Sequence, residues 1–565
     1  MPPVYALALS LLVTAPLLAP GYLLLRDAVS TPRSYLSDAA LGLSEAAPRA
    51  LPQDFAVAMA SQVLDGGIVV KALLVAGLWL AGWGAARLAA TVLPDAGVPG
   101  RCVAVTVAIW NPYVAERLLQ GHWSLLVGYG ALPWVAATVL RLRDGSGGWW
   151  PLPFWIALAG LTPTGALLAT AVALVGVCAP GAGRRRWQVV AATLAALLVT
   201  AAPWLVAAAV SKSLAATVSG SMASGVAVFA ARAEPGLGTL GSLAGLGGIW
   251  NAEAVPDSRT GLFAVVATLA LLAVVAVGAT VAVRRPAAVP LLVLAVAAVV
   301  FPALMATGPG LAAVEAIVRV LPGLGVLRDG QKWVALAVPG YAVAAAGVVV
   351  ALRGRVPVAA VGAVSCALLV AVLPDLAYGV GNRMVAVRYP AGWSAAADIV
   401  NADPRPVAVL PPDSMRQFDW AGSAPVLDPL PRWVRADVLS TGDLNVAGTT
   451  VPGEGGRARA VQELVMDGAS ARQLADAGVG WVVVEADGSA LDLPVAYRDD
   501  DLAVYRVGGD ATSSPHRTLL IAVHVAWLAL LAGSGLAGCV TLWRTSGAKI
   551  AVPLRRRLRR GPDQT

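Results

Sequence analysis

The stretch TGLFAVVATLALLAVVAVGATVAV (260–283) contains no charged residue and is followed directly by Arg284 and Arg285. A helix needs about 20 consecutive apolar residues to cross the hydrocarbon core of a bilayer. Blocks of similar length and composition stand at 4–25 and 356–374, and comparable blocks recur along the chain. The pattern therefore predicts a polytopic α-helical membrane protein.

The composition points to the same class. Hydrophobic residues make up 58% of the chain and charged residues only 13%, whereas soluble domains carry about 25% charged residues. The net charge is +8, but the basic residues cluster in short joints between apolar blocks. Lys and Arg beside spans stay on the cytoplasmic side. We therefore attribute the positive charge to membrane topology and expect no nucleic-acid partner.

The basic joints define a path through the membrane. Placing them inside gives about twelve transmembrane helices with both termini cytoplasmic, in a multi-pass protein of the cell (plasma) membrane. The first block, 4–25, has no basic residue before it, so we expect a retained helix and not a cleaved signal. The predicted parts are a membrane domain (1–377) with outer loops 26–66, 211–258 and 307–332, an outer domain (378–513), a last transmembrane helix (514–543) and a basic cytoplasmic tail (544–565).

The segment 378–513 is polar throughout and differs in kind from the rest. Short β-branched runs, PVAVLP (406–411), GWVVVEA (480–486) and LAVYRV (502–507), predict strands. A helical stretch, 457–478, precedes the second of these runs. Helices alternating with such strands predict an extracytoplasmic α/β domain that is long enough to bury its own core.

Metal and nucleotide motifs are not visible. The four cysteines lie in or beside apolar blocks, the three histidines are scattered, and neither HExxH nor CxxC occurs. The Gly-rich segment 229–259 lacks the GK[ST] of a phosphate-binding loop. We expect this segment to be a re-entrant or surface loop that closes over a cavity.

The first outer loop carries the first candidate for chemistry. Asp27 directly follows the first apolar block, and Asp38 and Asp54 are alternates in the same loop. A carboxylate at the outer interface suits a general base for an acceptor hydroxyl, or a ligand of a metal ion that binds a phosphate leaving group. The alternative is an interfacial carboxylate paired with Arg26 or Arg33.

A second polar cluster lies in NPYVAERLLQGHW (111–123). Glu116, Arg117 and His122 stand between two apolar pieces, with Gln120 at helical spacing from Arg117. These residues are candidates for binding a lipid phosphate or a substrate. The alternative is an interfacial belt of the kind that Trp and Tyr form at headgroup depth.

A third cluster lies in LPGLGVLRDGQKW (321–333), just before an apolar block. Arg328 and Lys332 are expected on the outer face, against the usual placement of positive charge. A lipid-linked phosphate or diphosphate would explain them as binding residues. The alternative is a loop whose charges are balanced by Asp329.

Three segments carry a family resemblance: WNPYVAERLLQGHWSLLVGYGALPW (110–134), 321–333 and YPAGWSAAADIVN (389–401). With an acidic residue after the first span and a C-terminal outer domain, the chain resembles the GT-C class of membrane glycosyltransferases. The similarity is to the actinobacterial arabinofuranosyltransferase-D-like and YfhO-type branch. The resemblance implies that Asp27 is the catalytic acidic residue of the first outer loop.

The same resemblance leaves the metal question open. The second acidic residue that such enzymes carry has three candidates, Asp38, Asp54 and Asp65, and none of them forms an adjacent acidic pair. The cofactor therefore stays unknown, with a divalent cation as one alternative.

The resemblance implies a transferase that moves a sugar from a polyprenyl-phosphate donor to a cell-envelope glycan or glycolipid. Its partners would be membrane lipids, the donor and the glycan acceptor. A lipid or polysaccharide transporter is an alternative, although the predicted spans carry few ionisable groups at mid-depth. A non-catalytic scaffold for envelope assembly is the other.

Overall fold

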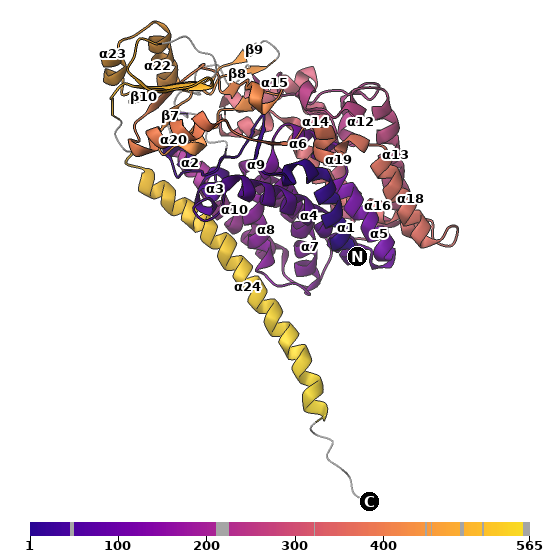
Figure 1. Cartoon of the computed structure of the whole chain (residues 1–565). Helices are drawn as coiled ribbons and strands as arrows, with labels where there is room; N and C mark the ends of the chain where they lie inside the picture. Colours follow the sequence, from indigo (N-terminus) through magenta and orange to yellow (C-terminus); the bar gives the residue numbers. More distant parts are fainter. Residues whose placement is uncertain are drawn as a thin grey trace, which may run out of the picture.

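The structure, a computed structural model, is dominated by helices (Figure 1) and describes residues 1–45, 50–210, 225–320, 322–446, 449–453, 455–485, 491–510 and 514–557. Within these ranges, six helices are long and apolar enough to cross a membrane. They are α4 (Gly66–Val92), α7 (Trp123–Asp144), α10 (Arg186–Val210), α13 (Phe263–Ala282), the span Gly330–Ala351, and Arg517–Thr541 within α24 (Arg517–Arg557). The chain is therefore a helical membrane protein by length and composition.

Two bent pairs of apolar helices raise the number of candidate spans to as many as eight. The axis turns by 90° between α14 (Val289–Met305) and α15 (Gly308–Val320), and by 77° after α18 (Val358–Ala371). Other predicted spans are short helices, such as α5 (Gly97–Ile109) and α8 (Pro151–Ala159). About twelve spans therefore stays a prediction.

Helices α4 and α7 pack closely and in parallel. A methyl group added at Gly130 would lie 2.2 Å from the carbonyl oxygen of Gly77. Further along both helices, the Trp134 indole N–H donates to the carbonyl of Leu80 over 2.9 Å. Small residues let membrane helices approach in this way. Because the paired positions advance together, the two helices begin at the same end of the bundle.

The prediction of one helix over 4–25 is wrong in its second half. Helix α1 (Pro2–Thr14) and a short 3₁₀ turn (Ala15–Leu18) are followed by strand β1 (Tyr22–Leu25). Pro20 lacks the backbone N–H that a helix needs, and Gly21 has a φ of 133°. Strand β1 pairs with β2 (Ala28–Val29) and with β3 (Ala386–Val387). Asp27 therefore lies in a hairpin turn and not at a helix end.

The C-terminal region contains a five-stranded sheet in the order β11-β12-β10-β4-β7. The predicted strands at 406–411, 480–486 and 502–507 are confirmed where they are described. The bounds are β4 (Val407–Leu410), β7 (Val438–Leu439), β10 (Trp481–Glu485), β11 (Val495–Arg498) and β12 (Leu502–Arg506). Strands β4, β7 and β10 run parallel, and β11 and β12 are antiparallel additions.

Helices cover both faces of this sheet. Helix α20 (Ala391–Ala402) packs on one face, and α22 (Gly456–Met466) and α23 (Ala471–Asp476) pack on the other. The predicted helix 457–478 is therefore two helices, which are separated at Gly468, where φ is 75°. Covered faces explain why the central strands read as continuous apolar runs.

The first outer loop and the C-terminal region share one core. Leu24 and Val29, on the β1–β2 hairpin, are buried together with Trp393 and Trp433. In Figure 1 the C-terminal strands lie at one end of the helix bundle, and α24 runs away from them along its side. The limits of a separate domain over 378–513 and its side of the membrane stay predictions, but its core includes residues from the N-terminal hairpin.

Some predicted segments lie partly outside the described residues. These are 46–49 in the first outer loop, 211–224 at the start of the loop 211–258, 511–513 before the last helix, and 558–565 in the basic tail.

We predict that the ends of α7 lie on opposite sides of the membrane. Glu253 is exposed near the end where α7 begins, and Asp144 is the last residue of α7. In a chain whose four cysteines have been replaced, a membrane-impermeant thiol reagent should label Glu253→Cys but not Asp144→Cys in intact cells. Both sites should react after permeabilisation. Labelling of position 144 from outside would overturn the topology.

Candidate functional site

Asp27 is held through one of its two carboxylate oxygens. Its Oδ2 lies 2.9 Å from Nε2 of His122 and accepts a hydrogen bond of 3.1 Å from the side-chain amide of Gln120. Its Oδ1 has no hydrogen-bond partner among the described residues, and the side chain is 38% exposed. The free oxygen is therefore available to a ligand.

Helix α6 (Pro112–Leu119) positions the residues opposite Asp27. The helix starts with Asn111, whose side chain accepts the Val114 N–H, and with Pro112 at its first position. It ends at Gln120, and His122 immediately precedes Trp123, the first residue of α7. The turn between α6 and α7 thus places Gln120 and His122 next to Asp27.

The buried side chain of Arg117 determines the protonation of His122. Its guanidinium donates two hydrogen bonds to Asp329, of 2.8 and 3.0 Å, and lies 3.0 Å from Nδ1 of His122. Arginine can only donate, so Nδ1 of His122 is an acceptor and its proton lies on Nε2. His122 is therefore a neutral imidazole that donates its N–H to Asp27.

The environment keeps Asp27 ionised and His122 neutral. Burial raises the pKa of the Asp27 carboxyl, but the hydrogen bonds of His122 and Gln120 and the charge of Lys332 outweigh it, so that the pKa lies below the ordinary 3.8. Burial, with the charges of Lys332 and Arg117, lowers the pKa of His122 below 6.5. At neutral pH the pair is a carboxylate with a neutral donor.

Glu116 ties the Gly-rich loop to α6. Its buried carboxyl accepts the backbone N–H groups of Gly248 and Ile249, at 3.1 and 3.2 Å, and the side-chain amide of Gln331 at 2.9 Å. Burial and the nearby Glu234 raise its pKa well above the ordinary value. That the Gly-rich segment closes over a cavity stays a prediction.

The contacts close into a ring of side chains. Gln331 connects Glu116 to Arg117, because its carbonyl oxygen accepts from the guanidinium while its amide donates to Glu116. At the other end, Asn251 of the Gly-rich loop donates to the Gln120 carbonyl over 2.8 Å. The ring therefore contacts the Gly-rich loop at two places, at Gly248 and Ile249 and again at Asn251. No local sequence pattern distinguishes Asn251 from other loop residues, so its role could not be predicted from the sequence.

Lys332 is connected to this ring through Asp329. Its Nζ is 3.5 Å from Asp329, and its side chain is 24% exposed. Its charge also contributes to the lowered pKa of Asp27. Asp27, His122 and Lys332 are therefore the site residues that a ligand can reach.

Two predicted binding residues have a different role. Glu116 and Arg117 have 0% exposed surface, so neither can contact a lipid phosphate directly in this structure. This corrects the sequence interpretation. The reason is that Arg117 is bound to Asp329 and Gln331, and Glu116 to the Gly-rich loop. Both residues therefore support the site through buried contacts.

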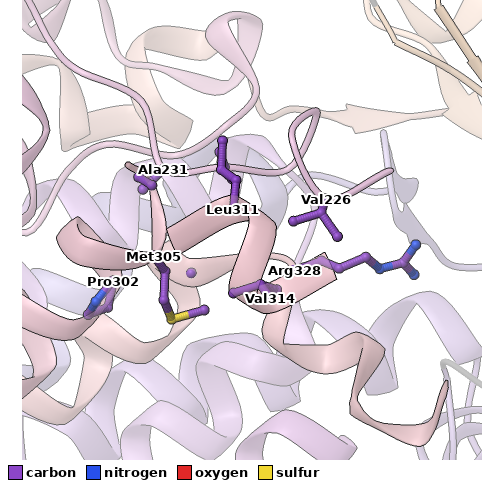
Figure 2. A pocket seen from close by; sticks show the side chains of 10 residues that line it. Val226, Ala231, Pro302, Met305, Leu311, Val314 and Arg328 are labelled. Carbon is purple, nitrogen blue, oxygen red and sulfur yellow. The ribbon is translucent and has the colours of Figure 1, made fainter. Parts of the chain in front are cut away.

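Arg328 is not part of the ring. Its Nε donates to the carbonyl of Gly325 over 3.2 Å, and its guanidinium lies over the ring of Phe229 at 5.5 Å. Figure 2 shows it beside a small pocket with apolar walls that include Leu311 and Val314. The pocket volume is about 10 Å³, which is room for about one water.

The other acidic candidates serve as structural contacts. Asp38 pairs with Arg517 at the start of α24, and Asp54 pairs with Arg432 at 3.2 Å. Asp65 caps α4 by accepting the N–H groups of Gly67 and Ile68, at 2.8 and 3.1 Å, and also accepts the Tyr22 hydroxyl. Of the four acidic candidates in the first outer loop, Asp27 alone has a histidine partner in the described part of the chain.

A divalent cation would find few ligands here. Within the described ranges, no three His, Cys, Asp or Glu side chains come together as a metal site. Asp27 offers one free oxygen, and His122 uses both ring nitrogens in the contacts above.

No protein-family model, curated protein or solved structure matches the chain.

We predict that Gly121→Ala disrupts the site. Gly121 has a φ of 83°, and an added Cβ would lie 2.3 Å from the backbone N of Ala28 and 2.4 Å from the carbonyl of Leu25. The hairpin that carries Asp27 would have to move, at a cost of about 1–3 kcal/mol. Thermal unfolding in detergent should show the loss. Gly261→Ala, where the described structure is open, should unfold like the wild type; equal stability of the two variants would contradict the prediction.

Proposed function

We propose that the protein is a membrane glycosyltransferase that transfers a sugar from a polyprenyl-phosphate donor to a cell-envelope glycan or glycolipid. The observation that carries the proposal is the Asp27 carboxylate, which has one free oxygen and a neutral histidine donor on the other. Lys332 supplies a partly exposed cation whose charge acts on Asp27. A base next to a cation suits a reaction in which a hydroxyl loses a proton while a phosphate departs.

The position of the site supports a lipid-linked donor. His122 stands one residue before α7, and Asp329 one residue before the span Gly330–Ala351. Because Arg117 contacts both residues, the N-terminal ends of these two candidate spans meet at the site. Helix N-terminal ends carry partial positive charge and favour anions. A phosphate at the membrane interface would therefore lie next to these two helix N-terminal ends.

The proposed reaction uses the free oxygen of Asp27. Oδ1 accepts the proton of the acceptor hydroxyl as the hydroxyl oxygen forms a bond to the anomeric carbon of the donor sugar. The bond between that carbon and the phosphate oxygen breaks, and its electron pair leaves with the polyprenyl phosphate. Lys332 offsets the charge on the departing phosphate. His122 and Gln120 hold Oδ2, so the carboxylate stays oriented.

We assign Asp27 the role of base and not of metal ligand. A Mg²⁺ ion is commonly bound through one or two carboxylates together with substrate phosphates. In the described structure Asp27 contacts His122 and Gln120, and Lys332, whose positive charge lowers the pKa of Asp27, would repel a cation. The proposal retains the wider expectation of a GT-C-like arrangement of about twelve spans, with both termini cytoplasmic and an outer C-terminal domain.

We predict that Asp27→Asn abolishes transfer while expression and membrane insertion stay normal. The amide keeps the size of the side chain but cannot take up the proton, and loss of a general base costs about 10²–10⁴ in rate. The assay is transfer by membranes that contain the protein, with a panel of radiolabelled polyprenyl-phosphate sugars.

The matched control is Asp257→Asn, which neutralises an exposed carboxylate in the neighbouring Gly-rich loop. This variant should retain wild-type transfer. Full activity of Asp27→Asn would remove Asp27 from the mechanism and would favour the scaffold interpretation.

We predict that transfer is constant from pH 7.5 to 6.5 and that any decline at lower pH has its midpoint below 6.5. Asp27 acts in its deprotonated form, which is lost only as the pH falls through a pKa below 3.8. His122 is needed in its neutral form, and its pKa lies below 6.5. A fall in kcat with a midpoint near 6.5 would mean that an unperturbed histidine controls the reaction.

A further inference from the structure

The turn that carries Asp27 is bound on its outer side by a strand of the C-terminal region. The backbone N–H of Arg26 donates to the carbonyl of Pro425, and the N–H of Leu427 donates to the carbonyl of Arg26, both over 2.9 Å. Arg26 thus bridges to Val426 in strand β6 (Val426–Leu427). The residue next to Asp27 is fixed by two backbone hydrogen bonds to one short strand.

Arg26 has little freedom to move away from this strand. Its φ is 48°, a conformation that residues other than glycine adopt rarely and at a cost. Its buried guanidinium donates to the carbonyl of Leu119 over 2.8 Å, at the end of α6. The backbone of Arg26 is therefore held by β6, and its side chain by Leu119 and Glu253.

Strand β6 is in turn held by a buried cluster of charged side chains. It pairs with β5 (Met415–Arg416), in which Arg416 lies opposite Val426. The Arg416 Nε donates to Glu485, the last residue of β10, over 2.8 Å, and its Nη2 lies 3.7 Å from Asp428. Asp428 also accepts the N–H of Leu430 over 2.7 Å. The hairpin is therefore fastened to the central sheet at Arg416.

The charges of this cluster balance. Arg416 and Glu485 have side chains that are 4% and 0% exposed, respectively. Burial and the charge of Asp428 raise the pKa of Glu485 well above its ordinary value, against the opposing effect of Arg416. A protonated Glu485 leaves Arg416 and Asp428 as the charged members of the cluster. One cation then faces one anion, as burial requires.

We propose that Arg416 is a positioning residue for Asp27, which it acts on through the β5–β6 hairpin. Neighbouring strands are about 4.8 Å apart, so two steps, from β5 to β6 and from β6 to Arg26, separate the backbones of Arg416 and Arg26 by about 10 Å. The sheet of the C-terminal region thereby sets the place of the carboxylate relative to His122. The kinetic part of this inference rests on the proposed function, whereas the mechanical part does not.

The mechanical part is tested by hydrogen exchange of the purified full-length protein. Arg416→Ala should speed amide exchange in the peptide 22–30 by about tenfold or more, because the backbone bonds of Arg26 open more often. Exchange in α22, on the other face of the sheet, should stay at the wild-type rate.

Two variants serve as controls. Arg405→Ala removes an arginine that pairs with Asp403 and Asp510 beside the same sheet, away from β6, and it should leave exchange in 22–30 unchanged. Glu485→Gln keeps an acceptor for Arg416, so it should also behave like the wild type.

If Arg416→Ala fails to fold, Arg416→Lys replaces it, since lysine keeps the charge but lacks the fork that reaches both carboxyl groups. A folded Arg416 variant with wild-type exchange in 22–30 would overturn the proposal. So would faster exchange that is uniform along the chain.

The kinetic part is tested by transfer assays on the same variants. Arg416→Lys should lower kcat by about tenfold with little change in the donor KM, since the donor contacts are untouched. Equal kcat in wild type and variant, with exchange in 22–30 increased, would overturn the kinetic part. Absence of transfer in the wild type would refute the proposed function and leave the exchange result to stand alone.

Discussion

The burial of the Arg117 guanidinium is the constraint on which the rest of the site depends. A buried cation is tolerated only when it is paired and hydrogen-bonded, and removal of one partner from such a pair typically costs about 3–5 kcal/mol. Arg117 meets this need with Asp329, Gln331 and His122, which come from two distant parts of the chain. Satisfying one side chain therefore brings the beginnings of two candidate spans together.

This constraint reaches the chemistry through His122. Because Arg117 can only donate, it keeps the Nδ1 of His122 unprotonated and directs the remaining N–H at Asp27. A protonated imidazole would place two donors against each other at Nδ1. The same contact thus orients the histidine and keeps it neutral. Asp27 remains the ionised and accessible member of the group.

A second constraint comes from outside the helix bundle. The β1–β2 hairpin places Leu24 and Val29 in the core of the C-terminal region, while Arg26, in its turn, donates to the carbonyl of Leu119 in the bundle. The hairpin therefore connects the two parts, and Asp27 lies at the joint. A carboxylate between the helix bundle and the C-terminal region is next to both parts. This position suits the proposed reaction between a lipid-linked donor and a polar acceptor.

The amino-acid sequence by itself determined the helical membrane character, the three central strands of the C-terminal sheet and the polar segments that carry Asp27, His122 and Lys332. Apolar block length, β-branched runs and charge placement are local properties, so local rules could find them. Only the tertiary structure decided that Asp27 lies in a hairpin turn, since β1 pairs with residues more than three hundred positions away. The tertiary structure also decided that Arg117 and Glu116 are buried supports of the site and that Asn251 completes the ring. Burial and hydrogen-bond partners depend on contacts between distant segments, and the sequence of one segment alone does not reveal these contacts.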